Sequence, residues 1–372
     1  MRLLDYKVEG AWIGLPVVEG FAPSNTTVVV HNNELLFQTR YVSYTKHLAS
    51  EAFNPYGFDM CQNYIFDNPY YESRNFRWSN GKFNEIVYPT GEDVRFRGLE
   101  DARMVVWNGE LYTYGVRCDK ANGKTRIVIY MPDGREVVAQ SPFDCDVEKN
   151  WMAVPDRPMT FVYGFKDYRV VVVTVDDDGS CSVVDNKNCN TEERLKSYWV
   201  HFNDIRGGSP LVKIEDGYLA VVHRQMWVNT GMGIGTGYWY RHAIVRFDNN
   251  LNVVDITSWF ILAHPLCEFC SGMTVFGDKV YLTYSVLDCI PMIMEFTLEG
   301  IMGLFGVEDD REDVDVSYWE AVMVNLFNNG HVRSAGVLAN WFLTLGIENP
   351  VYIDLYRPVL GVEEYMKIKY RR

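Results

Sequence analysis

Long apolar runs, basic charge and paired cysteines are all scarce in this sequence of 372 residues. Asp5, Lys7 and Glu9 interrupt the first twenty residues, so these lack the apolar stretch of a signal peptide. No segment approaches the roughly 18 apolar residues of a membrane helix. Eight cysteines spread over the chain do not make a disulfide framework. We therefore expect a soluble protein of a reducing compartment, the cytoplasm, with no membrane partner.

Acidic residues outnumber basic ones, and the formal net charge is −14. Binding to bare nucleic acid needs a clustered basic surface, because affinity for nucleic acid comes largely from phosphate contacts. The overall charge therefore argues against a nucleic-acid partner. It leaves room for a local basic pocket that holds a small anion.

Motifs for metals and nucleotide cofactors are also missing. Cys267 and Cys270 form a single C-x-x-C pair, and a structural zinc site needs two further ligands. The run "GMGIGTG" from Gly231 does not have G-x-G-x-x-G spacing, and no GK[ST] follows it. We expect buried, reduced thiols at the first motif, a mobile loop at the second, and neither a metal nor a cofactor.

Helical periodicity is scarce between residues 24 and 300, where short β-rich runs alternate with Gly, Asn and Asp turns. Five times a small polar cluster precedes an apolar strand, and a second strand rich in Tyr, Val and Leu follows. The five units are "PSNTTVVVHNNELLFQTRY", "GLEDARMVVWNGELYTYGVR", "EKNWMAVPDRPMTFVYGF", "RGGSPLVKIEDGYLAVVHRQ" and "FCSGMTVFGDKVYLTYSVLD". The third is the weakest, since it has no Gly turn between its strands.

The polar clusters align on Asn25, Asp101, Asn150, Ser209 and Ser271, at intervals of 76, 49, 59 and 62 residues. Repeats of about 40–50 residues that each form a four-stranded sheet are typical of a β-propeller. The pattern predicts an all-β fold, a five-bladed propeller over residues 1–300. Apolar spacing of three and four residues after the acidic "EDDREDVDV" predicts a short, partly helical extension over 301–372 that packs on the propeller.

In a propeller the first strand of each blade lines the central channel, so five polar clusters that enter these strands converge on one funnel. The predicted funnel has an unusual load of polar and charged side chains. Its members are Asn25, Glu100, Asp101, Arg103, Lys149, Asn150, Arg206, Ser209 and Glu268.

The order of these motifs resembles glycoside hydrolase family 130, the β-mannoside phosphorylases. "GLEDARMVVWNGELYTYGVR" resembles the family's G-x-E-D-P-R segment and the strands after it. "GGSPLVKIEDGYLAVVHRQ" and "CSGMTVFGDKVYLTYSVLD" are similar to two later blocks, so the resemblance covers residues 25 to 290. It implies a five-bladed β-propeller, shared with related β-1,2-mannosyltransferase/phosphorylases. It also implies that Asp101 donates a proton to the glycosidic oxygen and that basic residues around the funnel hold phosphate.

The carboxylates and cations can be assigned on chemical grounds as well. Glu100 and Asp101 are neighbours, so on a regular strand only one of them faces the pocket. Glu268 and Asp288 are candidates for the second carboxylate that an inverting glycosidase needs. Arginine and lysine suit an oxyanion ligand, because they bind phosphate through charge-assisted hydrogen bonds. The candidate phosphate ligands are Arg40, Arg103, Arg117, Lys149, Arg206, His223 and Arg224.

Aromatic side chains can stack on the apolar faces of sugar rings, although most aromatics in β-proteins pack in the core. The candidates are Tyr112, Tyr114, Trp151, Trp239 and Tyr240, and Trp151 is favoured because it stands in a polar cluster. Together these features predict an inverting carbohydrate-active enzyme that moves a glycosyl unit, such as mannosyl, between phosphate and a glycan acceptor.

Three alternatives remain open. One is a glycosyltransferase that uses a nucleotide sugar and modifies a glycan, a protein or a nucleic acid. Another is a glycosidase with two catalytic carboxylates. The third is a sugar-binding propeller without catalysis.

Overall fold

The computed structural model describes a large part of the chain, mainly between residues 15 and 306. The described residues are 15–48, 61–65, 71–79, 81–89, 96–118, 123–166, 169–186, 205–229, 236–262, 268–306, 322–324, 326–330, 335 and 338–339. Cys267 and most of the "GMGIGTG" run lie outside them, so the expectations for those two motifs stay predictions.

Five antiparallel sheets follow one another along the chain, and we number them as blades. Blade 1 contains β1 (Ala22–His31), β2 (Glu34–Val42), β5 (Tyr71–Ser79) and β6 (Lys82–Ile86), with β7 (Phe96–Arg97) parallel to β5. Blade 2 contains β8 (Glu100–Trp107), β9 (Glu110–Cys118), β10 (Thr125–Tyr130) and β11 (Glu136–Val138). Blade 3 contains β12 (Met152–Ala153), β13 (Thr160–Lys166), β14 (Arg169–Val175) and β15 (Cys181–Asn186).

The last two blades depart from four regular strands. Blade 4 contains β16 (Ile205–Gly207), β17 (Val212–Ile214), β18 (Gly217–Asn229), β19 (Thr236–Asp248) and β20 (Val253–Ile256). In the described part of the chain, blade 5 contains β21 (Glu268–Phe276), β22 (Lys279–Val286) and β23 (Ile290–Thr297). A separate hairpin pairs β3 (Tyr44–Leu48) with β4 (Cys61–Ile65).

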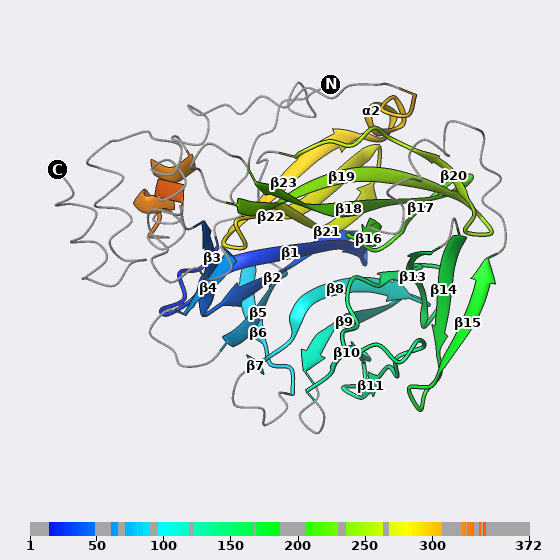
Figure 1. Ribbon diagram of the computed structural model, residues 1–372, viewed down its shortest axis with the longest axis horizontal. Helices are drawn as coiled ribbons and strands as arrows, with labels where there is room; N and C mark the ends of the chain where they lie inside the picture. Colours follow the sequence, from blue (N-terminus) through cyan, green and yellow to red (C-terminus); the bar gives the residue numbers. More distant parts are fainter. Residues whose placement is uncertain are drawn as a thin grey trace.

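The blades are arranged in a closed ring, with β1 beside both β8 and β21 (Figure 1). The first strand of each sheet is therefore the innermost one, as the polar clusters predict. The fold is an all-β, five-bladed propeller, and the predicted count of blades is confirmed. The weak third repeat corresponds to a real blade whose innermost strand, β12, has only two residues.

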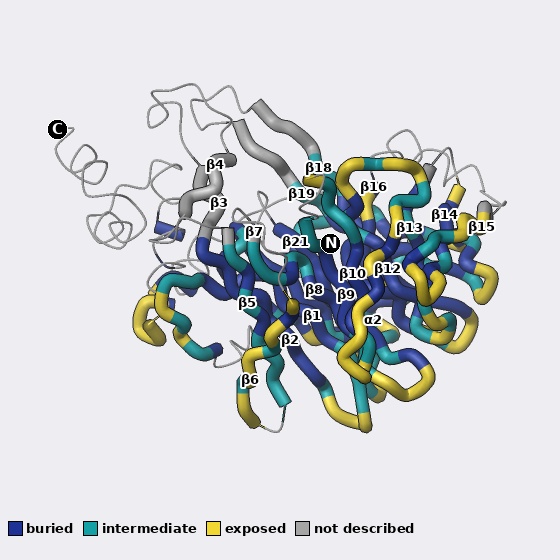
Figure 2. The backbone as a smooth tube through the Cα atoms, turned by 90° about the horizontal axis from the view of Figure 1, so that it is seen from below, coloured by how far each residue is buried: buried dark blue, intermediate teal, exposed yellow. Residues whose placement is uncertain are grey.

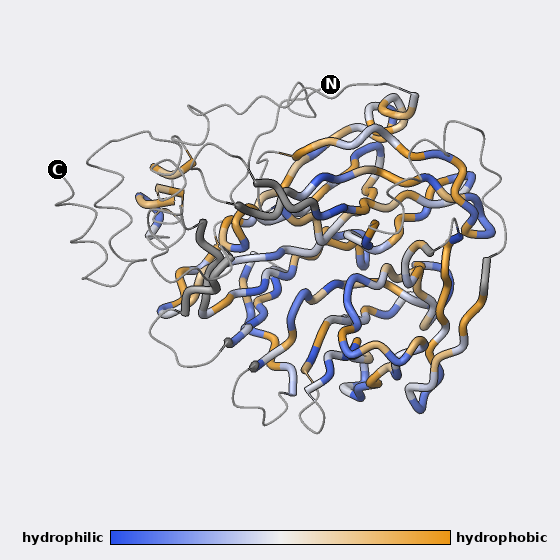
Figure 3. The backbone as a smooth tube through the Cα atoms, in the orientation of Figure 1, coloured by the Kyte–Doolittle hydropathy of each residue, from blue (hydrophilic) through white to orange (hydrophobic). Residues whose placement is uncertain are grey.

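The burial of each strand follows its place in the blade. β1 and β21 are buried on both faces over most of their length, whereas β11 and the second half of β23 alternate between buried and exposed residues. Figure 2 shows buried residues on the strands in the middle of the molecule and exposed residues on the peripheral turns. In Figure 3 many of the hydrophobic residues (orange) lie along the strands, because the strands supply the packed faces between blades. Apolar packing between neighbouring sheets thus stabilises the ring.

The polar clusters coincide with irregular backbone in the innermost strands. The pairing register shifts between Pro23 and Thr26 in β1, and between Glu100 and Arg103 in β8. In blade 4 the break lies between β16 and β17, where Gly208 and Ser209 both donate their N–H to the carbonyl of Val221. A bulge turns side chains away from regular alternation, so these strands can direct polar groups toward the axis.

Ring closure joins blade 5 to blade 1. The hydroxyl of Ser271 donates to the carbonyl of Thr26 at 2.7 Å. Gly272 lies so close to β1 that a Cβ atom there would be 2.8 Å from the nitrogen of Val28. The absence of a side chain at Gly272 and the small hydroxymethyl group of Ser271 therefore allow the backbones of the first and last blades to lie close together.

A short helix, α2 (Leu298–Met302), follows β23, and Thr297 caps its N-terminus. Residues 322–324 and 326–328 are also helical, and Val322, Met323 and Leu326 belong to the same buried cluster as β21–β23. The division of the chain at residue 300 stays a prediction, because most of the residues beyond 306 lie outside the described ranges. None of the described helices is long and apolar enough to cross a membrane.

Candidate active site

A cavity of about 500 Å³ opens at one end of the innermost strands, and every blade contributes to it. Blade 1 supplies Asn25, and blade 2 supplies Asp101. Lys149 comes from the segment before blade 3, Arg206 from blade 4 and Asp288 from blade 5. The cavity therefore forms only when the ring is closed, and it lies at the end of the innermost strands, where the sequence predicts a funnel.

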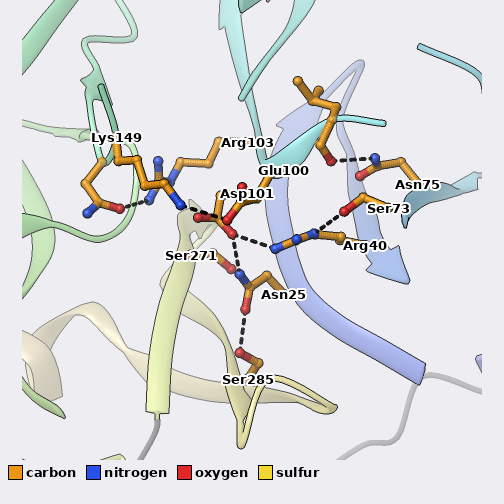
Figure 4. Close-up of polar contacts among 12 residues, drawn as sticks. Asn25, Arg40, Ser73, Asn75, Glu100, Asp101, Arg103, Lys149, Ser271 and Ser285 are labelled. Carbon is orange, nitrogen blue, oxygen red and sulfur yellow. Dashed lines mark hydrogen bonds and ion pairs between the residues drawn. The ribbon is translucent and has the colours of Figure 1, made fainter. Parts of the chain in front are cut away.

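Asp101 occupies an unusual backbone conformation in this cavity. Its φ angle is +50°, which lies in the left-handed region, and it stands at the bulge of β8. Its Oδ1 atom accepts hydrogen bonds from Nδ2 of Asn25 at 2.8 Å and from Nη1 of Arg40 at 2.9 Å. Ser73 holds Arg40 in turn, because Nε of Arg40 donates a hydrogen bond to the hydroxyl of Ser73 at 2.8 Å (Figure 4). Blade 1 thus orients the carboxylate of blade 2.

Glu100 and Asp101 both line the cavity. The expectation that only one of them faces the pocket is wrong, because the left-handed backbone at Asp101 breaks the alternation of a regular strand. The Oε1 atom of Glu100 accepts a hydrogen bond from Nζ of Lys149 at 2.8 Å. Burial lowers the pKa of Lys149, but Glu100 and Asp101 outweigh burial and raise it above its usual value. Lys149 is thus a protonated cation at the cavity wall.

Arg103 is a fully buried cation directly behind this wall. Its Nη2 atom donates to Oδ1 of Asn150 at 3.4 Å, and its guanidinium lies 5.6 Å from the ring centre of Phe269. Within the described part of the chain, Nε of Arg103 has no hydrogen-bond partner and the guanidinium forms no ion pair. A buried cation without a carboxylate partner is costly, and the amide of Asn150 and the ring of Phe269 are the contacts that the described residues give it.

His223 lines the cavity from β18 and is buried. Burial holds its pKa well below the usual value, and the nearby His242 and Arg103 act in the same direction. His223 is therefore neutral at physiological pH. Its Nδ1 atom has no hydrogen-bond partner among the described residues.

A second buried group lies deeper between blades 4 and 5. Nε2 of His242 accepts a hydrogen bond from the backbone N–H of Cys270 at 3.3 Å. Its Nδ1 atom lies 3.3 Å from Oε1 of Glu268, which also accepts the N–H of Leu262 at 2.6 Å. Glu268 is fully buried and does not line the cavity, so the structure gives it contacts within the fold.

The cavity brings together nine of the predicted site residues: Asn25, Arg40, Glu100, Asp101, Lys149, Asn150, Arg206, His223 and Asp288. The other six, which do not line it, are Arg103, Arg117, Trp151, Ser209, Arg224 and Glu268. The structure places these nine side chains around one cavity, and the role of each in binding or catalysis stays a prediction.

Three of the remaining residues have partners elsewhere. Arg117 on β9 donates to both carboxylate oxygens of Glu136 on the outer strand β11, at 2.8 and 2.9 Å. Arg224 lies 4.8 Å from the ring centre of Trp259. The hydroxyl of Ser209 accepts the N–H of Val221 within blade 4. These contacts place all three away from the cavity wall.

Trp151 is buried in the core between blades 2 and 3. Its ring packs against Phe161 and Tyr163, and its Nε1 atom donates to Oε2 of Glu148 at 3.1 Å. The structure therefore places it where no sugar can reach, and the expectation that it stacks on one is not supported by its position. Tyr114 is also in the core, whereas Tyr240 lines the cavity.

Several lining residues were not predicted, among them Ser73, Arg97 and Phe269. Ser73 lies on β5, the third strand of blade 1, and Arg97 lies on β7, just before the second polar cluster. Phe269 belongs to the fifth unit and follows Glu268. Its apolar side chain did not indicate a place in a polar cavity. Sequence spacing could reveal the innermost strands, but not which loops fold back over their ends.

Charge in the cavity differs from charge in the rest of the chain. Four cations (Arg40, Arg97, Lys149 and Arg206) face three carboxylates (Glu100, Asp101 and Asp288). The cavity thus has one cation more than carboxylates, whereas the whole chain has a net charge of −14. Among the described residues, no cluster of His, Cys, Asp or Glu could hold a metal ion.

The closed ring of five sheets and its axial cavity define a five-bladed β-propeller, a fold also found in known carbohydrate-active enzymes. The β-1,2-mannobiose phosphorylase from Listeria innocua is similar, with a TM-score of 0.50 and 14% identity over 79% of this chain and 95% of that one. At this identity the likeness establishes the fold, and the predicted architecture is confirmed.

Two further solved structures match over much of their length. One belongs to the GH130 family of mannoside phosphorylases, described as containing hydrolases for β-1,2 mannosidic linkages in Candida mannan; it has a TM-score of 0.46 and 13% identity over 79% and 93% of the two chains. The other is a GDP-mannose-dependent mannosyltransferase from Leishmania mexicana, with a TM-score of 0.45 and 13% identity over 79% and 90%. No protein-family model matches the chain, and no curated protein sequence is similar to it.

Proposed function

We propose that this chain is an inverting carbohydrate-active enzyme that moves a glycosyl unit to or from phosphate, with Asp101 as its acid and base. One observation carries the proposal. A carboxylate oriented by Asn25 and Arg40 shares a cavity with Lys149 and Arg206, and the buried cation Arg103 lies behind them.

Phosphorolysis suits this arrangement because it needs a single carboxylic acid. Phosphate is already an anionic nucleophile: its oxygen attacks the anomeric carbon while the glycosidic C–O bond breaks. The leaving oxygen then takes the proton that Asp101 supplies. In the reverse direction Asp101 accepts a proton from the acceptor hydroxyl, and the cations stabilise the departing phosphate.

Two side chains of blade 1 orient the carboxylate for this role. Oδ1 accepts hydrogen bonds from both Asn25 and Arg40, and these two bonds fix the direction of the carboxylate in the cavity.

A two-carboxylate glycosidase is the second candidate, and the position of Asp288 favours it. Asp288 lines the same cavity as Asp101 but comes from a turn in blade 5. An inverting glycosidase needs two carboxylates with room for a water molecule between them. Glu268 does not serve this candidate, because it is buried away from the cavity.

Mannosides are the first substrates to test, since the similar Listeria innocua protein is a β-1,2-mannobiose phosphorylase. The experiment incubates the protein with α-mannose 1-phosphate, other sugar 1-phosphates or GDP-mannose, each with mono- and oligosaccharide acceptors. Release of inorganic phosphate supports the proposal. Release of GDP alone indicates a nucleotide-sugar transferase, and phosphate-independent cleavage of a mannoside indicates the glycosidase. Binding without turnover indicates a sugar-binding propeller.

A further inference from the structure

A chain of hydrogen bonds runs from blade 5 through blade 1 to the carboxylate in blade 2. The hydroxyl of Ser285 in β22 donates to Oδ1 of Asn25 in β1. Nδ2 of Asn25 donates to Oδ1 of Asp101 at 2.8 Å (Figure 4). A serine in the last blade thus reaches the proposed acid and base through one side-chain amide.

The amide of asparagine has one donor end and one acceptor end, so its orientation decides what it offers to a carboxylate. Ser285 holds the acceptor end of Asn25, and this leaves the donor end facing Asp101. We propose that Ser285 is a positioning residue, which fixes the orientation of the Asn25 amide and thereby favours the ionised form of Asp101. The inference rests on the proposed role of Asp101 in catalysis.

Burial makes this control effective. Ser285 is 0% exposed and Asn25 is 4% exposed. Bulk water therefore has little access to the serine end of the amide to replace a lost hydroxyl. Because Asn25 and Ser285 belong to the first and last blades, closure of the ring is what brings them together.

Other titratable and charged groups surround Asp101. Arg103 is on the same strand and buried behind the wall. The groups that line the cavity are Glu100 on the same strand, Arg40 on β2, Arg97 on β7, Lys149 before β12, Arg206 on β16, the neutral His223 on β18 and Asp288 after β22. A change at Ser285 touches none of these groups directly. Its effect on Asp101 therefore isolates the contribution of the amide.

Removing the hydroxyl of Ser285 frees the amide of Asn25 to turn. A turned amide presents its oxygen to Asp101, and two acceptor oxygens repel each other unless the carboxyl carries a proton. Protonation of Asp101 then becomes easier. We expect Ser285→Ala to move the titration of this carboxyl upward by about one pH unit, the size typical of one charge-assisted hydrogen bond.

The test is an NMR titration of protein labelled with [13Cγ]aspartate, with Asp101→Asn used to assign the resonance. Ser285→Ala should raise the midpoint, and Ser285→Thr, which keeps the hydroxyl, should restore it. Ser271→Ala is the matched control, because Ser271 is also fully buried at the junction of blades 5 and 1 but donates to the backbone of Thr26. Should Ser285→Ala fail to fold, Ser285→Cys replaces it with a weaker donor of similar size.

An unchanged midpoint in Ser285→Ala overturns the proposal, as does an equal shift in Ser271→Ala. The titration needs no substrate, so it separates this inference from the proposed function. A shifted midpoint in a protein that releases no phosphate keeps the positioning role and rejects the phosphorylase. Where phosphate release is found, the pH–rate midpoint of Ser285→Ala should move in the same direction as the NMR midpoint.

Discussion

Lys149 and Glu100 form an ion pair across the wall of the cavity, with 2.8 Å between Nζ and Oε1. Lys149 precedes blade 3, whereas Glu100 begins the first strand of blade 2. The carboxylate therefore competes with any anion for the same ammonium group. This relationship gives a direct way to test whether the cavity binds phosphate.

Glu100→Gln should increase the affinity for phosphate, because the amide no longer attracts Lys149 and no longer repels the anion. Both side chains are about one third exposed, so we expect a gain of only about two- to fivefold in Kd. Isothermal titration with inorganic phosphate measures it. Glu136→Gln is the control, since it breaks the ion pair with Arg117 away from the cavity. Weaker phosphate binding in Glu100→Gln would place the anion elsewhere.

Phosphate or sulfate should protect the protein against thermal unfolding. A ligand at one hundred times its Kd stabilises the folded state by about 2.7 kcal/mol. Lys149→Ala and Arg103→Met should both reduce this protection, because each removes a cation at or behind the cavity wall. Arg117→Ala should keep this protection, because Arg117 is paired with Glu136 and does not line the cavity. If neither phosphate nor sulfate raises the melting temperature at high millimolar concentration, the proposed anion site is ruled out.

Asp101→Asn should lower turnover by about a hundred- to ten-thousand-fold, the usual contribution of general acid–base assistance. The amide keeps the size of the carboxylate, so folding and sugar affinity should stay close to those of the unchanged protein. Phosphate release and sugar binding are measured on the same preparation. Asp288→Asn is the comparison: if it abolishes turnover while Asp101→Asn does not, the two-carboxylate glycosidase replaces the phosphorylase.

The buried His223 should make stability depend on pH. Its pKa is lowered in the folded protein, whereas an unfolded histidine titrates near about 6.5. Below that pH the unfolded state binds more protons, so the free energy of unfolding falls as the pH drops from 7 to 5.5. One such histidine accounts for about 1 kcal/mol over this range. Urea unfolding of His223→Gln should show a shallower dependence, and parallel curves for the two proteins would contradict the assignment.

The sequence predicted the sites where the innermost strands begin, because a propeller repeats one local pattern. Asn25, Asp101 and Asn150 were chosen as the starts of polar clusters, and all three line the cavity. Ser209 and Ser271 were chosen for the same reason, but their hydroxyls bond to backbone within the fold. A polar cluster thus indicates a bulge near the axis, and the bulge geometry decides where each side chain lies.

The sequence could not predict which residues the charged and aromatic side chains contact. Arg40 and Arg117 both stand near the end of a second strand, yet one holds Asp101 and the other holds Glu136. Trp151 follows Asn150 directly, yet Asn150 lines the cavity and Trp151 packs against Phe161. Residues with equivalent positions in the pattern differ because their neighbours come from other blades.

Local pattern was therefore sufficient for the all-β class, the five blades and the end of the ring at which polar groups gather. The alternation of strands and the choice of turn residues depend on a few neighbouring positions, so both can be recognised in a single sequence. Closure of the ring was needed for the site. When blade 5 meets blade 1, Ser285 reaches Asn25, and Asn25 in turn donates to Asp101. The same closure gathers the cations and carboxylates into a cavity whose charge differs from that of the whole chain.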